Sequence, residues 1–259
     1  VMDYQAITLV VRDDIATLTL NRPDVMNALN TQMRAEITHA VKEAAARARV
    51  LVMTGAGAAF CSGQDLGDGG NAANLDLERT LRDEYVPMLR AIMDCPIPTI
   101  AAVNGAAAGA GANLALAFDV VIASEDAVFI QAFARIGLIP DAGGTYFLPR
   151  QIGAAKAMGT ALFADKISAK RACDWGMIFE TAPAEDFNDH WQARAAHLAK
   201  GPTTTYGHIK HAIRGSFENT LEDQLALEAR LQGACGKTRD FKEGVLAFLE
   251  KRPANYEGR

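Results

Sequence analysis

Three segments of the chain combine turns of small residues with polar groups that could stabilise or move charge. The first, residues 59–66 (AFCSGQDL), follows a predicted buried strand and the turn Gly55-Ala56-Gly57. A turn of this kind can leave backbone N–H groups, here at Gly63 and Gln64, free to point toward a ligand anion. An ordinary surface turn would have the same composition, and the segment taken alone favours that simpler interpretation.

The second segment, residues 101–114 (AAVNGAAAGAGANL), has the pattern of a strand, a turn of glycine and alanine, and the start of a helix. A helix N-terminus offers unpaired N–H donors, and small residues let a ligand approach the backbone. Two other interpretations stay open. Close helix packing also needs small residues, and Gly109-x-Gly111 gives two of the three glycines of a dinucleotide-binding fingerprint, with Leu114 at the third place.

The third segment, residues 133–145 (FARIGLIPDAGGT), places Asp141 among apolar residues and glycines. One interpretation is structural, because an aspartate after proline and before a short helix is a good N-cap. The other is catalytic, because a carboxylate in an apolar pocket has a raised pKa and can shuttle a proton. The sequence alone favours the N-cap.

Two further features are weaker. Lys251 and Arg252 end the last predicted helix, where positive charge is favourable, and they could also pair with a ligand phosphate. Ser62 could in principle act as a nucleophile, but it lacks the G-x-S-x-G frame of a nucleophile elbow. We therefore do not expect a serine hydrolase.

Composition narrows the class of protein. The 259 residues are 49% hydrophobic, which is enough for one sizeable core, and the net charge of −5 argues against a nucleic-acid binder. The four cysteines have no C-x-x-C spacing and no zinc pattern is visible, so we expect neither a disulfide framework nor a bound metal. The N-terminus shows no signal peptide, and the apolar run 97–118 is interrupted by polar residues and glycines. We expect a cytoplasmic protein that does not bind membranes.

The elements that must hold these segments alternate between strands and helices, which predicts an α/β core. From residue 168 onward the pattern predicts helices only, and Gly201-Pro202 suggests a soft boundary near residue 200. Residues 67–77 have many turn formers and predict a mobile loop. We predict strands at 6–11, 15–20, 50–54, 99–103, 120–123 and 128–130, and helices at 30–47, 77–93 and 111–116.

Local signals fix several ends of these elements. The turn Asp13-Asp14 between the first two strands predicts a hairpin. Asn30 or Thr31 is a suitable N-cap for the first helix, and Thr220 and Thr238 are suitable N-caps for two helices near the C-terminus.

Taken together, these segments resemble the crotonase (enoyl-CoA hydratase/isomerase) superfamily. The resemblance covers essentially the whole chain, from residues 20–23 (LNRP) through the three segments to residues 243–252 (EGVLAFLEKR). It implies a crotonase-type spiral of ββα turns at 1–200, containing the coenzyme A and acyl site. It also implies a C-terminal helical trimerisation region at 201–259, and a homotrimer or a dimer of trimers.

The same resemblance implies an acyl-CoA thioester as substrate, with coenzyme A as part of that substrate and no prosthetic group. It assigns the backbone N–H groups of Gln64 and Ala110 to an oxyanion hole, where loss of one donor typically costs roughly 2.7–4 kcal/mol. The residues that it places beside coenzyme A are Val25, Ala59, Gln64, Asp65 and Leu66, with Phe248 and Lys251 reaching the coenzyme A of a neighbouring subunit.

The departures from the family pattern concern the acids. Typical hydratases of the family carry two glutamates, and the matching positions here are Asn113 and Phe133. Asp141 stands where hydratases have glycine, and isomerases of the superfamily use an acid at or near this place. Residues 132–145, 61–65 and 174–178 further resemble the isomerases that act on 1,2-epoxyphenylacetyl-CoA.

We therefore expect an acyl-CoA isomerase with Asp141 as proton shuttle. Three alternatives stay open. The first is an enoyl-CoA hydratase of fatty-acid or aromatic degradation, and the second is a non-catalytic acyl-CoA-binding protein with the same fold. The third is an NAD-dependent oxidoreductase, for which we expect no nicotinamide binding.

Overall fold

The computed structural model describes residues 3–68 and 76–259. Its larger sheet begins with the predicted hairpin of β1 (Ile7–Arg12) and β2 (Ile15–Leu20), which pair antiparallel. Asp13 and Asp14 form the turn with φ of 52° and 62°, and positive φ at both central residues is what a tight type I′ hairpin turn requires. The remaining strands of this sheet pair parallel in the order β1-β2-β3-β5-β7-β10: β3 (Val50–Gly55), β5 (Thr99–Val103), β7 (Val120–Ser124) and β10 (Glu180–Ala182).

Strand β10 corrects the prediction that only helices follow residue 168. Its three residues carry no strand signal of their own, and they become a strand because Glu180–Ala182 pairs with Ile122, Ala123 and Ser124 of β7. The contact joins segments far apart in the sequence, so a local pattern could not predict it.

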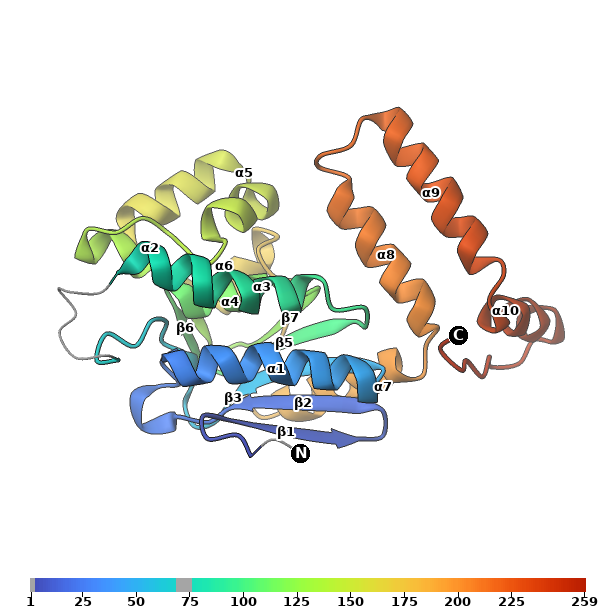
Figure 1. Cartoon of the computed structure of the whole chain (residues 1–259), viewed down its shortest axis with the longest axis horizontal. Helices are drawn as coiled ribbons and strands as arrows, with labels where there is room; N and C mark the ends of the chain where they lie inside the picture. The colour runs from blue at the N-terminus through green and yellow to red at the C-terminus, as the bar shows by residue number, and fades with distance from the viewer. Residues whose placement is uncertain (1–2, 69–75) are drawn as a thin grey trace.

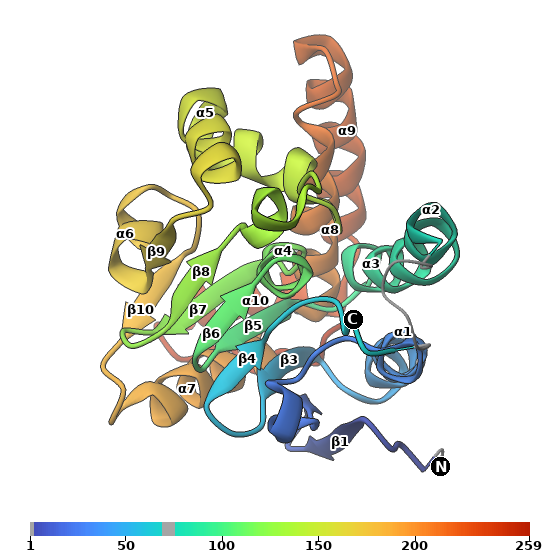
Figure 2. The ribbon, with the colours of Figure 1, turned by 90° about the vertical axis from the view of Figure 1, so that its left-hand side faces the viewer.

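A second sheet lies beside the first and contains parts of the first two candidate segments (Figure 2). It has the order β4-β6-β8-β9, with strands β4 (Ala59–Cys61), β6 (Ala106–Ala108), β8 (Val128–Ile130) and β9 (Lys166–Ser168). The chain passes from β3 to β4, from β5 to β6 and from β7 to β8, so three successive strands of the main sheet are each followed by a strand of the small sheet. This repetition is the spiral that the family resemblance implies.

Helices cover both faces of the main sheet (Figure 1). On one face lie α1 (Thr31–Arg47), α3 (Val86–Met93) and α4 (Ala110–Leu116), which pack on Leu51 and Met53 of β3. On the other lies α7 (Phe187–Ala199), whose Trp191 packs in a separate cluster with Val50 and Val52. Alternate residues of one strand thus enter opposite cores, as the two-residue period of a strand requires. The other helices of the core are α2 (Leu77–Thr80), α5 (Gly144–Phe163) and α6 (Ala169–Asp174).

The helix predicted at 77–93 contains a π-helical turn, η3 (Leu81–Tyr85), between α2 and α3. Pro87 lies two residues beyond this turn. Proline has no N–H to donate to the carbonyl four residues earlier and its ring crowds that carbonyl, so the regular ladder is broken just ahead of it. The turn brings Glu84 and Tyr85 toward α1, which matters for the site below.

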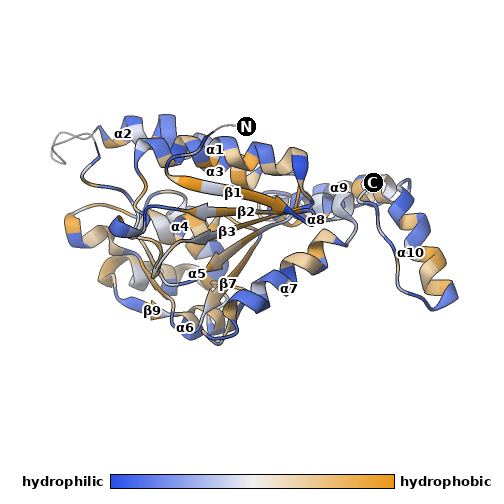
Figure 3. Cartoon of the chain, turned by 90° about the horizontal axis from the view of Figure 1, so that it is seen from below, coloured by the Kyte–Doolittle hydropathy of each residue, from blue (hydrophilic) through white to orange (hydrophobic). Residues whose placement is uncertain are grey.

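The C-terminal helices are α8 (Thr203–Gly215), α9 (Leu221–Cys235) and α10 (Arg239–Glu250). Thr220 and Thr238 accept hydrogen bonds from the backbone N–H groups of Asp223 and Phe241, which confirms both predicted N-caps. Helices α8 and α9 form a hairpin beside the core, and α10 lies beyond it (Figure 1). One side of α10 is apolar (Figure 3), and its apolar residues are exposed: Phe241, Val245, Phe248 and Leu249. In the described residues, no helix is both long enough and apolar enough to cross a membrane.

Candidate functional site

The pairing of β4 with β6 brings the two small-residue turns into contact. A Cβ on Gly63 would lie 2.8 Å from the carbonyl oxygen of Ala108 and 3.3 Å from the amide nitrogen of Ala110. Gly63 also has a φ of 96°, which side chains rarely allow. On the other side, a Cβ on Gly111 would lie 2.3 Å from the carbonyl oxygen of Cys61. Both glycines are therefore required for this close approach.

Two backbone N–H groups at this junction remain available to a ligand. Within residues 3–68 and 76–259, no acceptor takes the N–H of Gln64 or that of Ala110. The neighbouring amides are used, since Asp65 N–H donates to the Leu29 carbonyl and Gly109 N–H donates to the Ile130 carbonyl. These two free donors belong to turns that are in contact, and free backbone donors held close together can stabilise a developing oxyanion.

The loop before α1 supports the first turn. Ser62 N–H donates to the Met26 carbonyl over 2.9 Å, and Leu29 N–H donates to the Gly63 carbonyl over 2.7 Å. Arg22 forms an ion pair of 2.8 Å with Asp65. Burial favours the protonated form of Asp65, but hydrogen bonds from Arg22 and from the Gly67 N–H outweigh it and hold the pKa of the carboxyl below its usual value.

The residues predicted to contact coenzyme A fall in two regions. Val25 and Leu66 are exposed, Ala59 is buried, and Gln64 and Asp65 are half-buried, all around this first turn. Phe248 and Lys251 are instead at the end of α10, away from the turn within one chain (Figure 1). The side chain of Phe248 is 83% exposed. Their assignment to a neighbouring subunit's ligand stays a prediction.

Asp141 does not cap a helix, so the simpler interpretation of this residue is wrong. The N-cap of α5 is Gly143, and no side chain caps that helix end. Asp141 contributes its backbone carbonyl, which accepts the N–H of Gly144. Positive φ at Ala142 and Gly143 turns the chain directly after it, and this sharp turn separates the Asp141 side chain from the helix end.

The Asp141 carboxyl group has the properties of a proton-transfer group. Burial raises its pKa from 3.8 to about 6, against a smaller opposing effect of a backbone hydrogen bond. Its Oδ1 atom is buried and has no hydrogen-bond partner in the described residues. A general acid or base works best when its pKa is near the operating pH, and this carboxyl group is close to that condition.

Asn113 and Phe133 occupy the two positions that the family resemblance matches to the glutamates of hydratases, and both contact residues of the candidate site. Asn113 is fully buried, and its Nδ2 donates to the Asp141 carbonyl over 2.8 Å. Its Oδ1 accepts a bond of 2.8 Å from Nε2 of the buried Gln131. The ring of Phe133 lies against Gly109. A neutral amide and a phenyl ring cannot act as a general base at neutral pH, whereas the amide does fix the backbone at Asp141.

Two further residues lie near the first turn, Arg34 and Tyr85, and no sequence pattern indicated either of them. Arg34 belongs to the amphipathic pattern of α1, where an arginine is ordinarily exposed, but its side chain is buried. Tyr85 is placed by the π-helical turn, which helical periodicity does not predict. The described residues contain no group of three or more His, Cys, Asp or Glu side chains that could hold a metal ion.

The comparisons with known proteins agree with this geometry. A family model described as enoyl-CoA hydratase/isomerase matches residues 11–259. The chain belongs to the enoyl-CoA hydratase/isomerase family. Family membership makes it an enzyme that acts on acyl-CoA thioesters, and its α/β fold of two sheets and C-terminal helices is the crotonase fold.

Relatives within the family differ in the reaction that their names give. A protein of Rhodobacter capsulatus described as a "probable enoyl-CoA hydratase" is 59% identical over 258 residues, covering 100% of both chains. The 1,2-epoxyphenylacetyl-CoA isomerase of Escherichia coli is 44% identical over 254 residues, covering 96% of this chain and 97% of its own. The crystal structure of an enoyl-CoA hydratase from Polaromonas superposes with a TM-score of 0.92 at 33% identity, covering 98% of this chain and 100% of that one. Membership of the family is therefore shown, and the choice of reaction depends on the acids of the site.

Proposed function

We propose that this enzyme isomerises acyl-CoA thioesters by moving one proton within the acyl chain, with Asp141 as the group that carries it. In a 3-enoyl-CoA, the Asp141 carboxylate takes the proton from C2. The electron pair delocalises over the carbon chain and the thioester oxygen, whose negative charge is stabilised by the N–H groups of Gln64 and Ala110. Asp141 then returns the proton to C4, giving the conjugated 2-enoyl-CoA without any co-reactant.

The single observation that carries this proposal is the isolated carboxyl group of Asp141. Its pKa of about 6 leaves most of it ionised at neutral pH, so that it can accept a proton, and keeps it acidic enough to return the proton. Hydration would also require a group to activate water, and the positions that would supply the family's glutamates are Asn113 and Phe133. One acid is sufficient for isomerisation because the proton leaves and returns through the same group.

The proposed acyl group is aromatic. The basis is similarity to the Escherichia coli enzyme named 1,2-epoxyphenylacetyl-CoA isomerase, together with the segments 61–65, 132–145 and 174–178. We propose 1,2-epoxyphenylacetyl-CoA as substrate beside simple 3-enoyl-CoAs. The assignment is tested by comparing kcat/KM for 1,2-epoxyphenylacetyl-CoA with kcat/KM for an aliphatic 3-enoyl-CoA. A preference for the aliphatic substrate would contradict it.

The test of the mechanism is Asp141→Asn, an isosteric change that removes the proton carrier. We expect isomerisation of a 3-enoyl-CoA, followed by absorbance of the conjugated thioester, to fall at least a hundredfold while acyl-CoA binding persists. Asp126→Asn, at an exposed aspartate after β7, is the matched control and should leave turnover unchanged. Unchanged turnover of Asp141→Asn would end the proposal.

The alternative with its own support is an enoyl-CoA hydratase, because the Rhodobacter capsulatus relative carries that description. Hydration of crotonyl-CoA separates the two reactions. Hydration as fast as isomerisation would favour the hydratase. Acyl-CoA binding without turnover of any substrate would favour a non-catalytic binding protein.

We also propose that the chain assembles as a homotrimer or a dimer of trimers through its C-terminal helices. Support comes from the exposed apolar side of α10, where Phe241, Phe248 and Leu249 are each more than half exposed, since large exposed apolar patches mark interaction sites. Sedimentation of the full chain tests this proposal, and a monomer at micromolar concentration would refute it.

A further inference from the structure

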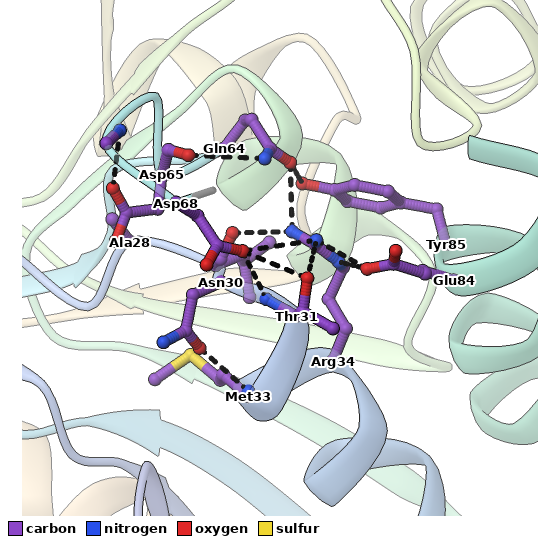
Figure 4. A network of polar contacts seen from close by, with 12 residues as sticks. Ala28, Asn30, Thr31, Met33, Arg34, Gln64, Asp65, Asp68, Glu84 and Tyr85 are labelled. Carbon is purple, nitrogen blue, oxygen red and sulfur yellow. Dashed lines mark hydrogen bonds and ion pairs between the residues drawn. The ribbon is translucent and has the colours of Figure 1, made fainter. Parts of the chain in front are cut away.

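The side chain of Gln64 is held by two donors from different parts of the chain. Its Oε1 accepts a hydrogen bond of 2.6 Å from the Tyr85 hydroxyl and one of 2.9 Å from Arg34 Nη1 (Figure 4). The backbone N–H of the same residue is one of the two free amides. Whatever fixes the Gln64 side chain therefore also restrains the direction of that amide.

Arg34 contacts the turn at a second point. Its Nη1 donates to the carbonyl of Leu29 over 2.6 Å, and this carbonyl also accepts the N–H of Asp65. The guanidinium group forms an ion pair of 2.6 Å with Glu84. A buried arginine destabilises a fold unless its charge is paired and its donors are used, and these contacts meet both conditions. Arg34 thus contacts the turn directly at the Gln64 side chain and indirectly at Asp65, through the Leu29 carbonyl.

Tyr85 connects this turn to the helix that begins with α2. Its side chain is buried, and the π-helical turn places it beside Glu84, the ion-pair partner of Arg34. The guanidinium group of Arg34 lies 4.9 Å from the centre of the Tyr85 ring. Burial raises the pKa of the Tyr85 hydroxyl, and the nearby Asp141 raises it further in spite of Arg34. The hydroxyl therefore remains a hydrogen-bond donor at neutral pH.

We propose that Tyr85 and Arg34 are positioning residues that act through the Gln64 side chain to aim the Gln64 amide at the thioester oxygen. The inference rests on the proposed oxyanion site. It assigns a role in catalysis to the π-helical turn of the 77–93 helix, consistent with the frequent occurrence of such turns at functional sites. Neither side chain is assigned a contact with the substrate.

A double-mutant cycle with Tyr85→Phe and Gln64→Ala tests this role, because Gln64→Ala keeps the backbone N–H and removes the side-chain oxygen that accepts both bonds. The substitution also removes a longer bond of 3.3 Å from Gln64 Nε2 to the Asp65 carbonyl. We expect Tyr85→Phe to lower kcat about tenfold, the usual scale for one lost hydrogen bond, with KM changing less than twofold. Gln64→Ala should lower kcat at least as much. The double variant should match Gln64→Ala, because Tyr85 then has no acceptor through which to act.

Controls keep the outcome interpretable. Tyr4→Phe removes a hydroxyl that bonds Nδ1 of His39 over 2.8 Å, and it should leave kcat unchanged. Gln64→Met keeps most of the side-chain volume without accepting either bond, and it replaces Gln64→Ala if that variant does not fold. Unfolding curves for each variant separate a loss of stability from a loss of kcat.

Two results would overturn the inference. One is a Tyr85→Phe enzyme with full kcat. The other is a double variant in which the two losses multiply, since Tyr85 would then act independently of Gln64. The cycle is run on whichever acyl-CoA reaction the unmodified enzyme catalyses. A failure of the isomerase proposal, seen as unchanged turnover of Asp141→Asn, is thus distinguished from a failure of the positioning role.

Discussion

Removing the Asp141 carboxylate should stabilise the fold at neutral pH, and the gain should depend on pH in a defined way. Burial raises the pKa of Asp141 from 3.8 to about 6, so the folded state disfavours the ionised form. Each pKa unit corresponds to about 1.4 kcal/mol, so a difference of about two units gives roughly 3 kcal/mol as an upper limit. This cost is absent below pH 3.8, where both states are protonated, grows between pH 3.8 and 6, and is complete above pH 6.

The assay is urea unfolding of the unmodified enzyme and of Asp141→Asn between pH 4.5 and 8 at one protein concentration. The buried amide of asparagine has its own desolvation cost, so the informative quantity is the change with pH of the difference in unfolding free energy. We expect this difference to move in favour of Asp141→Asn by about 2 kcal/mol as the pH rises over this range. Asp126→Asn is the control. A difference for Asp141→Asn that stays constant with pH would show that burial does not raise the pKa of Asp141.

Two further substitutions test the residues that support the site. Gly63→Ala places a side chain at a φ of 96° and a Cβ 2.8 Å from the Ala108 carbonyl oxygen. It should lower the free energy of unfolding in urea by about 1–3 kcal/mol and lower kcat by disturbing both free amides. An unchanged free energy of unfolding together with an unchanged kcat would contradict this close approach. Asn113→Asp removes the donor to the Asp141 carbonyl and buries a charge. It should cost about 2–3 kcal/mol of stability at pH 8 and less at pH 5, where the new carboxyl group can be protonated. Unfolding curves that match the unmodified enzyme at both pH values would contradict a stabilising role for this hydrogen bond.

The sequence predicted the features of this fold that depend on local patterns. The β1–β2 hairpin, the N-cap of α1 at Asn30 and the caps at Thr220 and Thr238 are each fixed by residues within a few positions of one another. Strand β10 was missed because only its pairing with β7 makes it a strand. Residues 67 and 68 of the predicted loop lie in a turn, and residues 69–75 fall outside the described residues.

The same distinction holds for the site. The two turns were identified from their small residues, and the structure shows why Gly63 and Gly111 tolerate no side chain. For Asp141, the sequence could not choose between an N-cap and a buried acid, because burial and the positive φ of Ala142 are properties of the packed turn. Tyr85 and Arg34 were missed because a buried arginine and a π-helical turn both depart from helical periodicity, and only the packing of α1 against the 77–93 helix brings them to Gln64.

In the proposed reaction, Asp141 moves a proton to and from the carbon beside a thioester whose oxygen is held by the Gln64 and Ala110 amides. Exchange in deuterium oxide is the direct test, because the proton on the Asp141 carboxyl group can exchange with solvent before it returns to the substrate. Enolate formation then labels that carbon whether or not a double bond moves. NMR of a 3-enoyl-CoA incubated with the unmodified enzyme should show rapid deuterium incorporation at C2. Asp141→Asn should abolish the incorporation while still binding the thioester. Equal incorporation with both enzymes would contradict the account.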